Sequence, residues 1–268
     1  MLLVLKKFLS LHWEKGRPIL LSCSGGPDSK ALLYLLIEAK KWFELEIHVA
    51  HIDHGWREES GAEAEALKKE VEGLRLPFHL KKLQNVQVKE EAARDGRYAA
   101  LSLIAREIDA QAIVLAHQME DQAETVLKRI FEGATLPACK GMKEVSQHHE
   151  YKLWRPLLSV SKKELMEWLE YQKISYFTDP TNLDPQYLRG RLRTSIFPFL
   201  EKEFGKSIVK NLCLLGKRAE KLEEHLMRVS DETVLEFVLK SRNPTATRDE
   251  IATLMKQLRN RSCIKSVK

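Results

Sequence analysis

The amino-acid sequence predicts an α/β fold, in which a doubly wound and mostly parallel sheet is followed by a small α-helical C-terminal domain. Two observations predict this fold. Short apolar runs typical of buried strands alternate with longer helical patterns over the first two-thirds of the chain. After about residue 205 the pattern becomes helical and basic. The 268 residues suffice for one large core and a smaller one, and we expect domains at 1–204 and 205–268.

Four strands are expected, each leading to a helical pattern. The strands are Ile19–Ser22, Leu45–Ala50, a short run near Phe78–Leu80, and Ala112–Ala116. The helices are expected around 31–36, 58–72, 89–107 and 120–131. Right-handed crossovers between parallel strands bring the loops that follow the strands to one edge of the sheet. We therefore expect the polar motifs after these strands to lie together at that edge.

The net charge of +6 is unevenly divided along the chain. Residues 1–150 carry 21 basic and 23 acidic side chains, whereas residues 151–268 carry 23 basic and 15 acidic ones. The basic residues of the second part form two groups: Arg189, Arg191, Arg193, Lys202, Lys206, Lys210, Lys217 and Arg218, then Lys256, Arg259, Arg261, Lys265 and Lys268. Such a surface attracts polyanions by releasing their counterions. Charge alone leaves a solvated basic helix as an equal alternative.

The segment after Gly205 has apolar residues at helical spacing with basic residues between them. The apolar positions are Ile208, Val209, Leu212, Leu215, Ala219, Leu222 and Leu226. The stripe suits a helix that supports a bound polyanion, and it suits equally the seam of a homodimer. Gly205 is a candidate hinge between the two domains.

Composition also indicates a cytoplasmic protein without membrane contact. No apolar run approaches the length of about 18 residues that a membrane-spanning helix needs. The apolar start Met1–Leu5 ends at Lys6 without a cleavage site. No two of the four cysteines form a CxxC pair, which favours reduced thiols over a disulfide framework or a zinc ribbon. They are Cys23, Cys139, Cys213 and Cys263.

The loop Ser24–Ser29, with the sequence Ser-Gly-Gly-Pro-Asp-Ser, is the strongest single signal for function. Two glycines after a buried strand allow close approach of the backbone, and the N–H groups that open the next helix point at an anion. The spacing is neither that of a Walker A loop nor that of a dinucleotide-binding fingerprint. A phosphate cradle is therefore indicated, and a turn that binds no ligand is the alternative.

A Ser-Gly-Gly-x-Asp-Ser loop between a strand and a helix resembles the PP-loop of the N-type ATP pyrophosphatases, whose fold is adenine nucleotide alpha hydrolase-like. Five further motifs follow in the order of the landmarks of the tRNA(Ile)-lysidine synthetase family, so that the resemblance covers about Leu20 to Leu200. They are His51–Arg57, Glu91–Tyr98, Ala116–Thr125, Arg155–Leu158, and Asp179–Asn182 with Arg189–Arg193.

The resemblance implies an ATP-dependent ligase that forms a carbon–nitrogen bond. Such an enzyme adenylates the C2 oxygen of the wobble cytidine in tRNA(Ile) with a CAU anticodon, and free L-lysine then displaces AMP to form lysidine. The amino-acid identity of the tRNA changes from methionine to isoleucine. The resemblance further implies ATP and Mg²⁺ as cofactors and a tRNA-binding role for the basic domain 205–268. That domain is short beside relatives with two C-terminal domains.

The resemblance also assigns roles to matching positions. The residues expected to bind ATP are Ser24, Gly25, Gly26, Pro27, Asp28, Ser29, His51 and His117. Asp28, Arg97, Asp121 and Glu124 are expected to be catalytic, with Asp28 near a metal or an amine, and no metal ligand is assigned. Those expected to bind substrate are Asp121, Glu124, Arg191 and Arg193.

Asp121 and Glu124 also suit an amine on physical grounds. A spacing of three places both carboxylates on one face at the start of a helix. Deprotonation and positioning of the ε-amine of lysine require such groups. The alternative is that Asp121 only caps the helix while Glu124 pairs with Lys128 at i,i+4.

Three other positions have two interpretations each. His117 suits contact with phosphate or a structural hydrogen bond. His51, Asp53 and His54 favour a turn on the adenine side of the site, with a zinc site as the lesser alternative. Arg193 suits a phosphate of ATP or tRNA, or an exposed arginine-rich helix.

Two substitutions depart from the family pattern: Gln118 stands where a second histidine is usual, and Gly190 where asparagine is usual. Glu120 keeps the charge of the usual aspartate. These departures are the support for a non-catalytic tRNA-binding protein. A tRNA thiolase typically needs paired cysteines, and an amide-forming enzyme of small metabolites needs no basic domain, so both are less favoured alternatives.

Overall fold

The computed structural model describes residues 1–53, 55, 60–83, 90–178, 186–228, 239–240, 247, 249–254 and 256. The chain forms two compact units, Met1–Asp121 with Lys143–Thr194, and Gln122–Met142 with Ser195–Lys268. The limits of these units differ from those of the predicted domains, 1–204 and 205–268, which stay a prediction. Among the described residues, no helix has both the length and the apolar character that crossing a bilayer requires.

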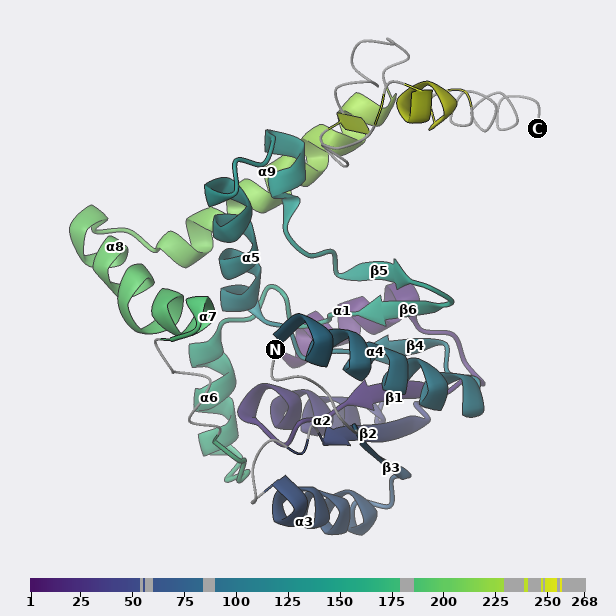
Figure 1. Cartoon of the computed structure of the whole chain (residues 1–268). Helices are drawn as coiled ribbons and strands as arrows, with labels where there is room; N and C mark the ends of the chain where they lie inside the picture. Colours follow the sequence, from purple (N-terminus) through teal and green to yellow (C-terminus); the bar gives the residue numbers. More distant parts are fainter. Residues whose placement is uncertain are drawn as a thin grey trace. The chain divides into compact units, whose positions relative to one another are not determined.

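A six-stranded sheet forms the centre of the first unit, in the order β3-β2-β1-β4-β6-β5 (Figure 1). The strands are β1 Ile19–Ser22, β2 Ile47–Asp53, β3 Phe78–Lys82, β4 Ala112–Val114, β5 Val145–His148 and β6 Tyr151–Trp154. Every neighbouring pair is parallel except β5 with β6. The chain proceeds from β1 to one side through β2 and β3, and then returns to the other side through β4. The predicted doubly wound, mostly parallel sheet is confirmed.

Helices cover both faces of this sheet. They are α1 Leu2–His12, α2 Pro27–Ala39, α3 Ser60–Gly73, α4 Glu90–Glu107 and α6 Lys162–Tyr171. The short α7 Leu188–Arg191 follows later in the same unit. Successive strand residues point to opposite faces, so Leu21 packs in one core with α1, α2, α3 and α6. Leu20 packs in the other core with α4. Both faces of the central strands are therefore apolar.

Strand β2 extends three residues beyond its predicted end at Ala50, because its pairing with β3 continues to Asp53, which lies opposite Lys82. His51 and Asp53 therefore lie on a strand and not in a turn. The sequence reading also missed α1, β5, β6 and α6. Strands of four residues such as β5 and β6 are too short for a clear alternating pattern.

The described part of the second unit is mainly helical. It contains the later part of α5 Met119–Phe131, the 3₁₀ turn η1 Leu136–Lys140, α8 Phe197–Phe204 and α9 Ile208–Arg228. Gly216 of α9 lies against η1, since a Cβ there would come 3.3 Å from the Lys140 oxygen. The Lys140 Nζ donates to Glu223 Oε1 at 2.6 Å, and Glu223 is buried. Helix α9 confirms the helix predicted after residue 205, and Gly205 ends α8 in the left-handed conformation with φ 60°.

Some predicted positions lie outside the described residues. They are His54, Trp56 and Arg57 of the motif His51–Arg57, the whole of Asp179–Asn182, and Cys263 with the tail residues Arg259, Arg261, Lys265 and Lys268.

A buried ion pair joins α2 to α3 behind the PP-loop. Lys30 is 1% exposed, and its ammonium donates to both carboxylate oxygens of Glu70. The Tyr34 hydroxyl also donates to Glu70, at 2.8 Å. Burial, together with this hydrogen bond, raises the pKa of Tyr34 to about 12. Because α2 begins within the PP-loop, this pair helps to hold the loop in place.

We expect Glu70→Gln to destabilise the protein by about 3 kcal/mol, since it leaves the Lys30 charge buried without a counter-ion. Urea denaturation followed by circular dichroism measures the change. The matched control is Glu44→Gln, which breaks an ion pair with Lys15 whose side chains are 73% and 68% exposed. That pair is worth roughly 0–1 kcal/mol. Equal losses in the two variants would contradict a stabilising role for the buried pair.

Candidate active site at the carboxyl edge of the sheet

The PP-loop follows β1 and turns directly into α2. Ser29 Oγ donates to the Gly26 oxygen at 2.9 Å and lies 3.2 Å from Ser24 Oγ, so the two serines close the loop on itself. Helix α2 begins at Pro27, and among the described residues no side chain caps this helix end. The first-turn N–H groups are therefore oriented toward an anion. This geometry is compatible with a phosphate cradle, and the binding of phosphate by the loop stays a prediction.

Gly25 is required by the loop for two reasons. Its φ of 81° lies in the left-handed region, which side chains disfavour. A Cβ at Gly25 would come 2.5 Å from the Phe177 ring, and the Phe177 N–H donates to the Gly25 oxygen at 2.9 Å. The segment after α6 therefore packs directly on the loop.

Asp28, in the first turn of α2, is held by a lysine from a distant part of the chain. Lys162 Nζ, at the start of α6, donates to Asp28 Oδ1 at 2.6 Å. Burial raises the pKa of Asp28, while the Lys162 charge acts in the opposite direction. The nearby Asp121 carboxylate also raises it, and Arg193 lowers it. Asp28 thus lies in an electrostatic cluster with residues from α5, α6 and the stretch after α7.

The start of α5 is stabilised by reciprocal capping. Gln118 Oε1 accepts a hydrogen bond from the Glu120 N–H at 2.7 Å, and Asp121 Oδ2 accepts one from the Gln118 N–H at 3.0 Å. Such a pair satisfies N–H groups that a helix end leaves without partners. Gln118 is 2% exposed. The departure from the family pattern at Gln118 therefore leaves the helix start intact.

Asp121 uses its other oxygen for an arginine. Arg193 Nη2 donates to Asp121 Oδ1 at 2.8 Å. Arg193 lies in the π-helical stretch η3 Leu192–Ile196, which directly follows α7. The interpretation of Asp121 as a helix cap is thus confirmed, but Asp121 also belongs to the charged cluster. Lys128, the alternative partner of Glu124, lies 3.6 Å from Glu132.

Glu120 connects α5 with α6. Its Oε2 accepts a hydrogen bond from the Lys162 N–H at 2.9 Å, and burial raises the pKa of its carboxyl group. The Asp121 and Asp28 charges raise it further. Asp28, Glu120 and Asp121 therefore form a group of three interacting carboxyls, with Lys162 and Arg193 as the cations that contact them. We call these five residues the carboxylate cluster.

His117 follows β4 in a strongly cationic environment. Burial is the largest cause that lowers the pKa of His117 to about 3, followed by the charges of Arg155, Arg97, Arg189 and Arg94. The ring is therefore neutral at physiological pH. Neither His117 Nδ1 nor Arg155 Nε has a hydrogen-bond partner among the described residues. We call His117 and these four arginines the arginine cluster; it combines positive charge with two buried polar atoms that have no partner among the described residues.

Two further predicted residues are placed by β2. His51 Nδ1 lies 2.9 Å from the Cys23 oxygen and so ties β2 to the start of the PP-loop. Asp53 Oδ1 accepts a hydrogen bond from the Gly55 N–H at 2.8 Å. Burial raises the pKa of Asp53, but hydrogen bonds from Gly55 and Ser60 outweigh it, and the net shift is downward. Asp53 therefore shapes the end of β2. Among the described residues, no group of three His, Cys, Asp or Glu side chains is arranged as a metal site.

The structure brings Asp28, Asp121 and Arg193 into one cluster, whereas Arg97 acts on His117. Glu124 is buried one turn beyond Asp121, and Arg191 is exposed. Arg191 Nη1 donates to the Gln186 oxygen at 3.0 Å. The sequence did not predict a site role for Lys162, Glu120, Phe177 or Arg155. Ser161 and Glu164 have the spacing of a capping box, which marks the start of α6. The position of Lys162 at a helix start could therefore have been predicted from the sequence.

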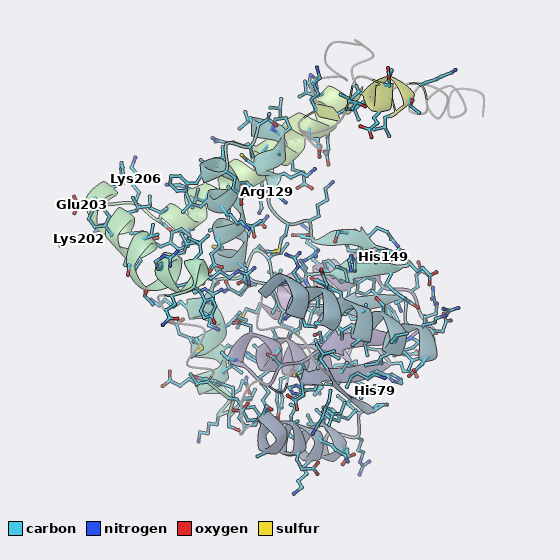
Figure 2. The ribbon with its side chains drawn as sticks, in the orientation of Figure 1. His79, Arg129, His149, Lys202, Glu203 and Lys206 are labelled. Atoms are coloured by element: carbon cyan, nitrogen blue, oxygen red, sulfur yellow. The ribbon has the colours of Figure 1, made fainter. Side chains whose placement is uncertain are left out.

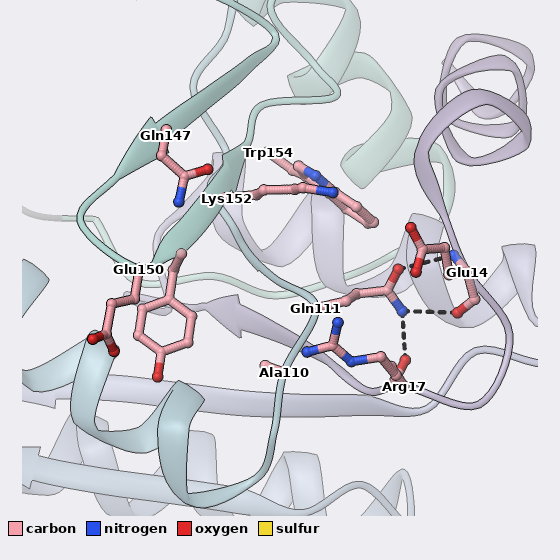
Figure 3. A pocket seen from close by; sticks show the side chains of 9 residues that line it. Glu14, Arg17, Ala110, Gln111, Gln147, Glu150, Lys152 and Trp154 are labelled. Carbon is pink, nitrogen blue, oxygen red and sulfur yellow. Dashed lines mark hydrogen bonds between the residues drawn. The ribbon is translucent and has the colours of Figure 1, made fainter.

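A small cavity of about 180 Å³ lies at the opposite edge of the sheet (Figure 3). Gln111, which lines it, accepts from the Glu14 N–H and donates to the oxygens of Glu14 and Arg17. Its amide group is therefore occupied in clamping the chain between α1 and β1. This cavity lies before β1 and β4, far along the strands from the PP-loop.

We expect Gly25→Ala to weaken ATP binding and to destabilise the protein, because Phe177 must move away from the new methyl group. Gly16→Ala is the matched control, since Gly16 has φ 87° and nothing within 4 Å of its Cβ position. Both variants carry the backbone strain, roughly 1–2 kcal/mol. The clash costs Gly25→Ala a further 1–3 kcal/mol or so. Urea denaturation and ATP titration measure both effects. Equal stability in the two variants would show that the Phe177 contact is unimportant.

We expect His117 to remain neutral down to about pH 4, given its pKa of about 3. In the unfolded chain a histidine binds its proton near pH 6.5. His117 therefore contributes stability above that pH, and this contribution is lost as the pH falls from about 6.5 towards 3. NMR titration of the imidazole resonances, with His117→Gln to assign the signal, measures it. The variant should also show a shallower loss of stability over that range. A midpoint near 6.5 for this resonance would contradict the burial of a neutral ring.

Comparisons with known proteins agree with this geometry. A model of the PP-loop domain family matches residues 3–200. The structure resembles that of the U34-tRNA thiolase NcsA from Methanococcus maripaludis, with a TM-score of 0.66 over 82% of this chain and 77% of that one. At 18% sequence identity this likeness shows the fold alone.

Closer relatives are tRNA(Ile)-lysidine synthases. Those of Protochlamydia amoebophila, Chlamydia pneumoniae and Chlamydia felis are 38%, 44% and 38% identical to this chain, over 84%, 82% and 94% of its length. The matched parts make up 50%, 68% and 78% of those proteins, so this chain spans half the length of the first of them. The chain belongs to the PP-loop domain family and, within it, to the family of tRNA(Ile)-lysidine synthases.

Proposed function

We propose that this chain is itself a tRNA(Ile)-lysidine synthase, a ligase that uses ATP to attach L-lysine to the wobble cytidine of tRNA(Ile) with a CAU anticodon. The observation that carries the proposal is the carboxylate cluster beside the PP-loop. Its carboxylates suit a cationic nucleophile, and its cations Lys162 and Arg193 suit an anionic leaving group. The identity to lysidine synthases over most of the chain supports the choice of substrates.

The first step is adenylation of the cytidine. The C2 oxygen attacks the α-phosphorus of ATP, the bond to the bridging oxygen breaks, and its electron pair leaves with pyrophosphate. The N–H groups at the start of α2 stabilise the negative charge that develops on the phosphates. The arginine cluster supplies further positive charge beside the reacting groups. Its neutral His117 is able to accept or donate a hydrogen bond without adding charge.

The second step is substitution by lysine. The ε-amine attacks C2 of the activated cytidine, the C2–oxygen bond breaks, and AMP leaves with that oxygen and its electron pair. The ammonium group of lysine must first lose a proton. Asp121 and Glu124, on successive turns of α5, hold the ammonium and accept the proton. The shared charge of three carboxyls favours binding of a cation at this place.

Mg²⁺ fits the same cluster. Magnesium in nucleotide sites is commonly held by one or two carboxylates together with the phosphates, and oxygen atoms are its preferred ligands. Asp28 supplies such an oxygen at the PP-loop. Burial and the Asp121 charge raise the pKa of its carboxyl group, so a bound cation favours its ionised form. When bound, the metal supplies positive charge for the phosphates.

The tRNA partner is supported by the basic surface of the second unit. Lys202 lies in the last turn of α8 beside Glu203, and Lys206 follows just after the end of this helix (Figure 2). On α9, Lys210, Lys217 and Arg218 are exposed while Leu212 and Ala219 are buried. Exposed cations of this kind bind phosphates without reading sequence. We infer that the predicted domain 205–268 binds tRNA. Its remaining apolar residues leave a homodimer as a further proposal, testable by light scattering.

The decisive assay incubates the protein with ATP, Mg²⁺, radiolabelled lysine and separate transcripts of tRNA(Ile) with a CAU anticodon and tRNA(Met). We expect label in the isoleucine transcript alone. Asp28→Asn and Asp121→Asn should lower the rate by at least about 100-fold, the usual cost of losing one electrostatic group that acts in the transition state.

The control for this assay is Asp109→Asn, which changes a carboxyl that is 84% exposed and pairs with Arg17. Its rate should equal that of the unaltered protein. If neither transcript is labelled but AMP release still depends on tRNA, the enzyme adenylates tRNA and uses a nucleophile other than lysine. The absence of both label and AMP release would overturn the proposed function.

A further inference from the structure

We propose that Lys162 is a further catalytic residue: its ammonium neutralises Asp28 before the nucleotide binds, and it moves to the departing pyrophosphate when ATP and a divalent cation arrive. The inference rests on the proposed function, because it concerns the same ATP site. Its consequence is that the metal and the nucleotide enter together, since Lys162 and the metal compete for the same carboxylate.

Hydrogen bonds at the start of α6 fix the backbone position of Lys162. Ser161 caps α6, and its hydroxyl and N–H exchange hydrogen bonds with Glu164 in a complete capping box. The Lys162 N–H donates to Glu120 Oε2 at 2.9 Å, which fixes α6 against the start of α5. The backbone of Lys162 is thus rigidly held, while its long side chain remains free to change partner.

The contact with the PP-loop is made by the side chain alone. Lys162 Nζ lies 2.6 Å from Asp28 Oδ1, with the two side chains 36% and 29% exposed. A partly exposed ion pair of this kind is worth little in stability. Lysine is also a compact charge on a flexible stem with donors able to serve either a carboxylate or a phosphate. The pair is therefore easy to open, as an exchange of partners requires.

A cation is needed at this place because the PP-loop contains none. Lys30, which follows the loop, is buried and bonded to Glu70, so it is directed away from the phosphates. Arg193 is bonded to Asp121, and Arg97 acts electrostatically on His117. Among the described residues, Lys162 is the cation that an ion pair joins to the loop itself. Negative charge that develops on the pyrophosphate lies next to Asp28 and therefore next to Lys162.

The charges of the cluster explain why the exchange is favourable. Asp28, Glu120 and Asp121 bring three negative charges when ionised, and Lys162 and Arg193 bring two positive ones. A divalent cation at Asp28 displaces the ammonium, and the ammonium then requires a new anion. The phosphates supply it. Metal without nucleotide leaves Lys162 beside a second cation, which is unfavourable.

The test compares Lys162→Met, which removes the charge and keeps most of the stem, with Lys162→Arg, which keeps the charge. The matched control is Lys163→Met, whose lysine is 84% exposed and pairs with Glu167 on the outer side of α6. Three quantities are measured: Mn²⁺ affinity without nucleotide by electron paramagnetic resonance, Mg·ATP affinity by calorimetry, and tRNA-dependent release of AMP. The first two need no turnover.

Opposite changes are expected in Lys162→Met. Mn²⁺ without nucleotide should bind about threefold to fivefold more tightly, the factor that a partly exposed ion pair is worth. Mg·ATP should bind roughly tenfold to a hundredfold more weakly, the factor for one hydrogen bond to a charged group. AMP release should fall with it, while Lys162→Arg recovers a large part and Lys163→Met behaves as the unaltered protein.

Unchanged affinities for Mn²⁺ and Mg·ATP in Lys162→Met would overturn the proposal and leave Lys162 as a helix-end residue. Weaker binding of both ligands would also overturn it, because that result indicates a collapsed site and not a competition. These outcomes are distinct from failure of the proposed function. If the unaltered protein transfers no lysine, the two binding experiments still decide whether Lys162 exchanges Asp28 for phosphate.

Discussion

Parallel pairing of β1 with β4 is the constraint on which the site depends. Leu21 lies opposite Val114, so the two strands end within one residue of each other, and a short loop then leads from each strand into a helix. The starts of α2 and α5 are consequently neighbours, each with an acidic residue in its first turn, Asp28 and Asp121. Acidic side chains favour helix starts, but two of them at one place repel each other. Ion pairs with Lys162 and Arg193 offset this repulsion.

The cations come from the part of the chain after β6. Lys162 and Arg193 reach Asp28 and Asp121 across a sequence separation of 134 and 72 residues. A PP-loop alone therefore would not make the site, since its acid is balanced only after α6 and η3 have folded onto the edge of the sheet. The packing of Phe177 against Gly25 also holds the segment after α6 against the PP-loop. A second set of cations, Arg94, Arg97, Arg155 and Arg189, acts on His117.

The parallel strands β1 to β4 and the PP-loop were predictable because local pattern determines them, whereas β5 and β6 were not predicted. Ile19–Ser22 is observed with the predicted limits, and α4 ends at Glu107 as expected. The electrostatic partners were not predictable, because no periodicity relates Lys162 to Asp28 or Arg193 to Asp121. The role of Gln118 was likewise not predictable from the sequence. It looked like a weakened catalytic position in the sequence, and only the hydrogen bond to Glu120 shows that it is a helix cap. Roles that arise from one residue's neighbours in space require the fold.

The most direct test of this account is a crystal structure of the protein with a non-hydrolysable ATP analogue, Mg²⁺ and L-lysine. The account predicts the triphosphate on the N–H groups of the Ser24–Ser29 loop, with the lysine ammonium at Asp121. A nucleotide bound elsewhere, such as at the opposite edge of the sheet beside Gln111, would contradict it.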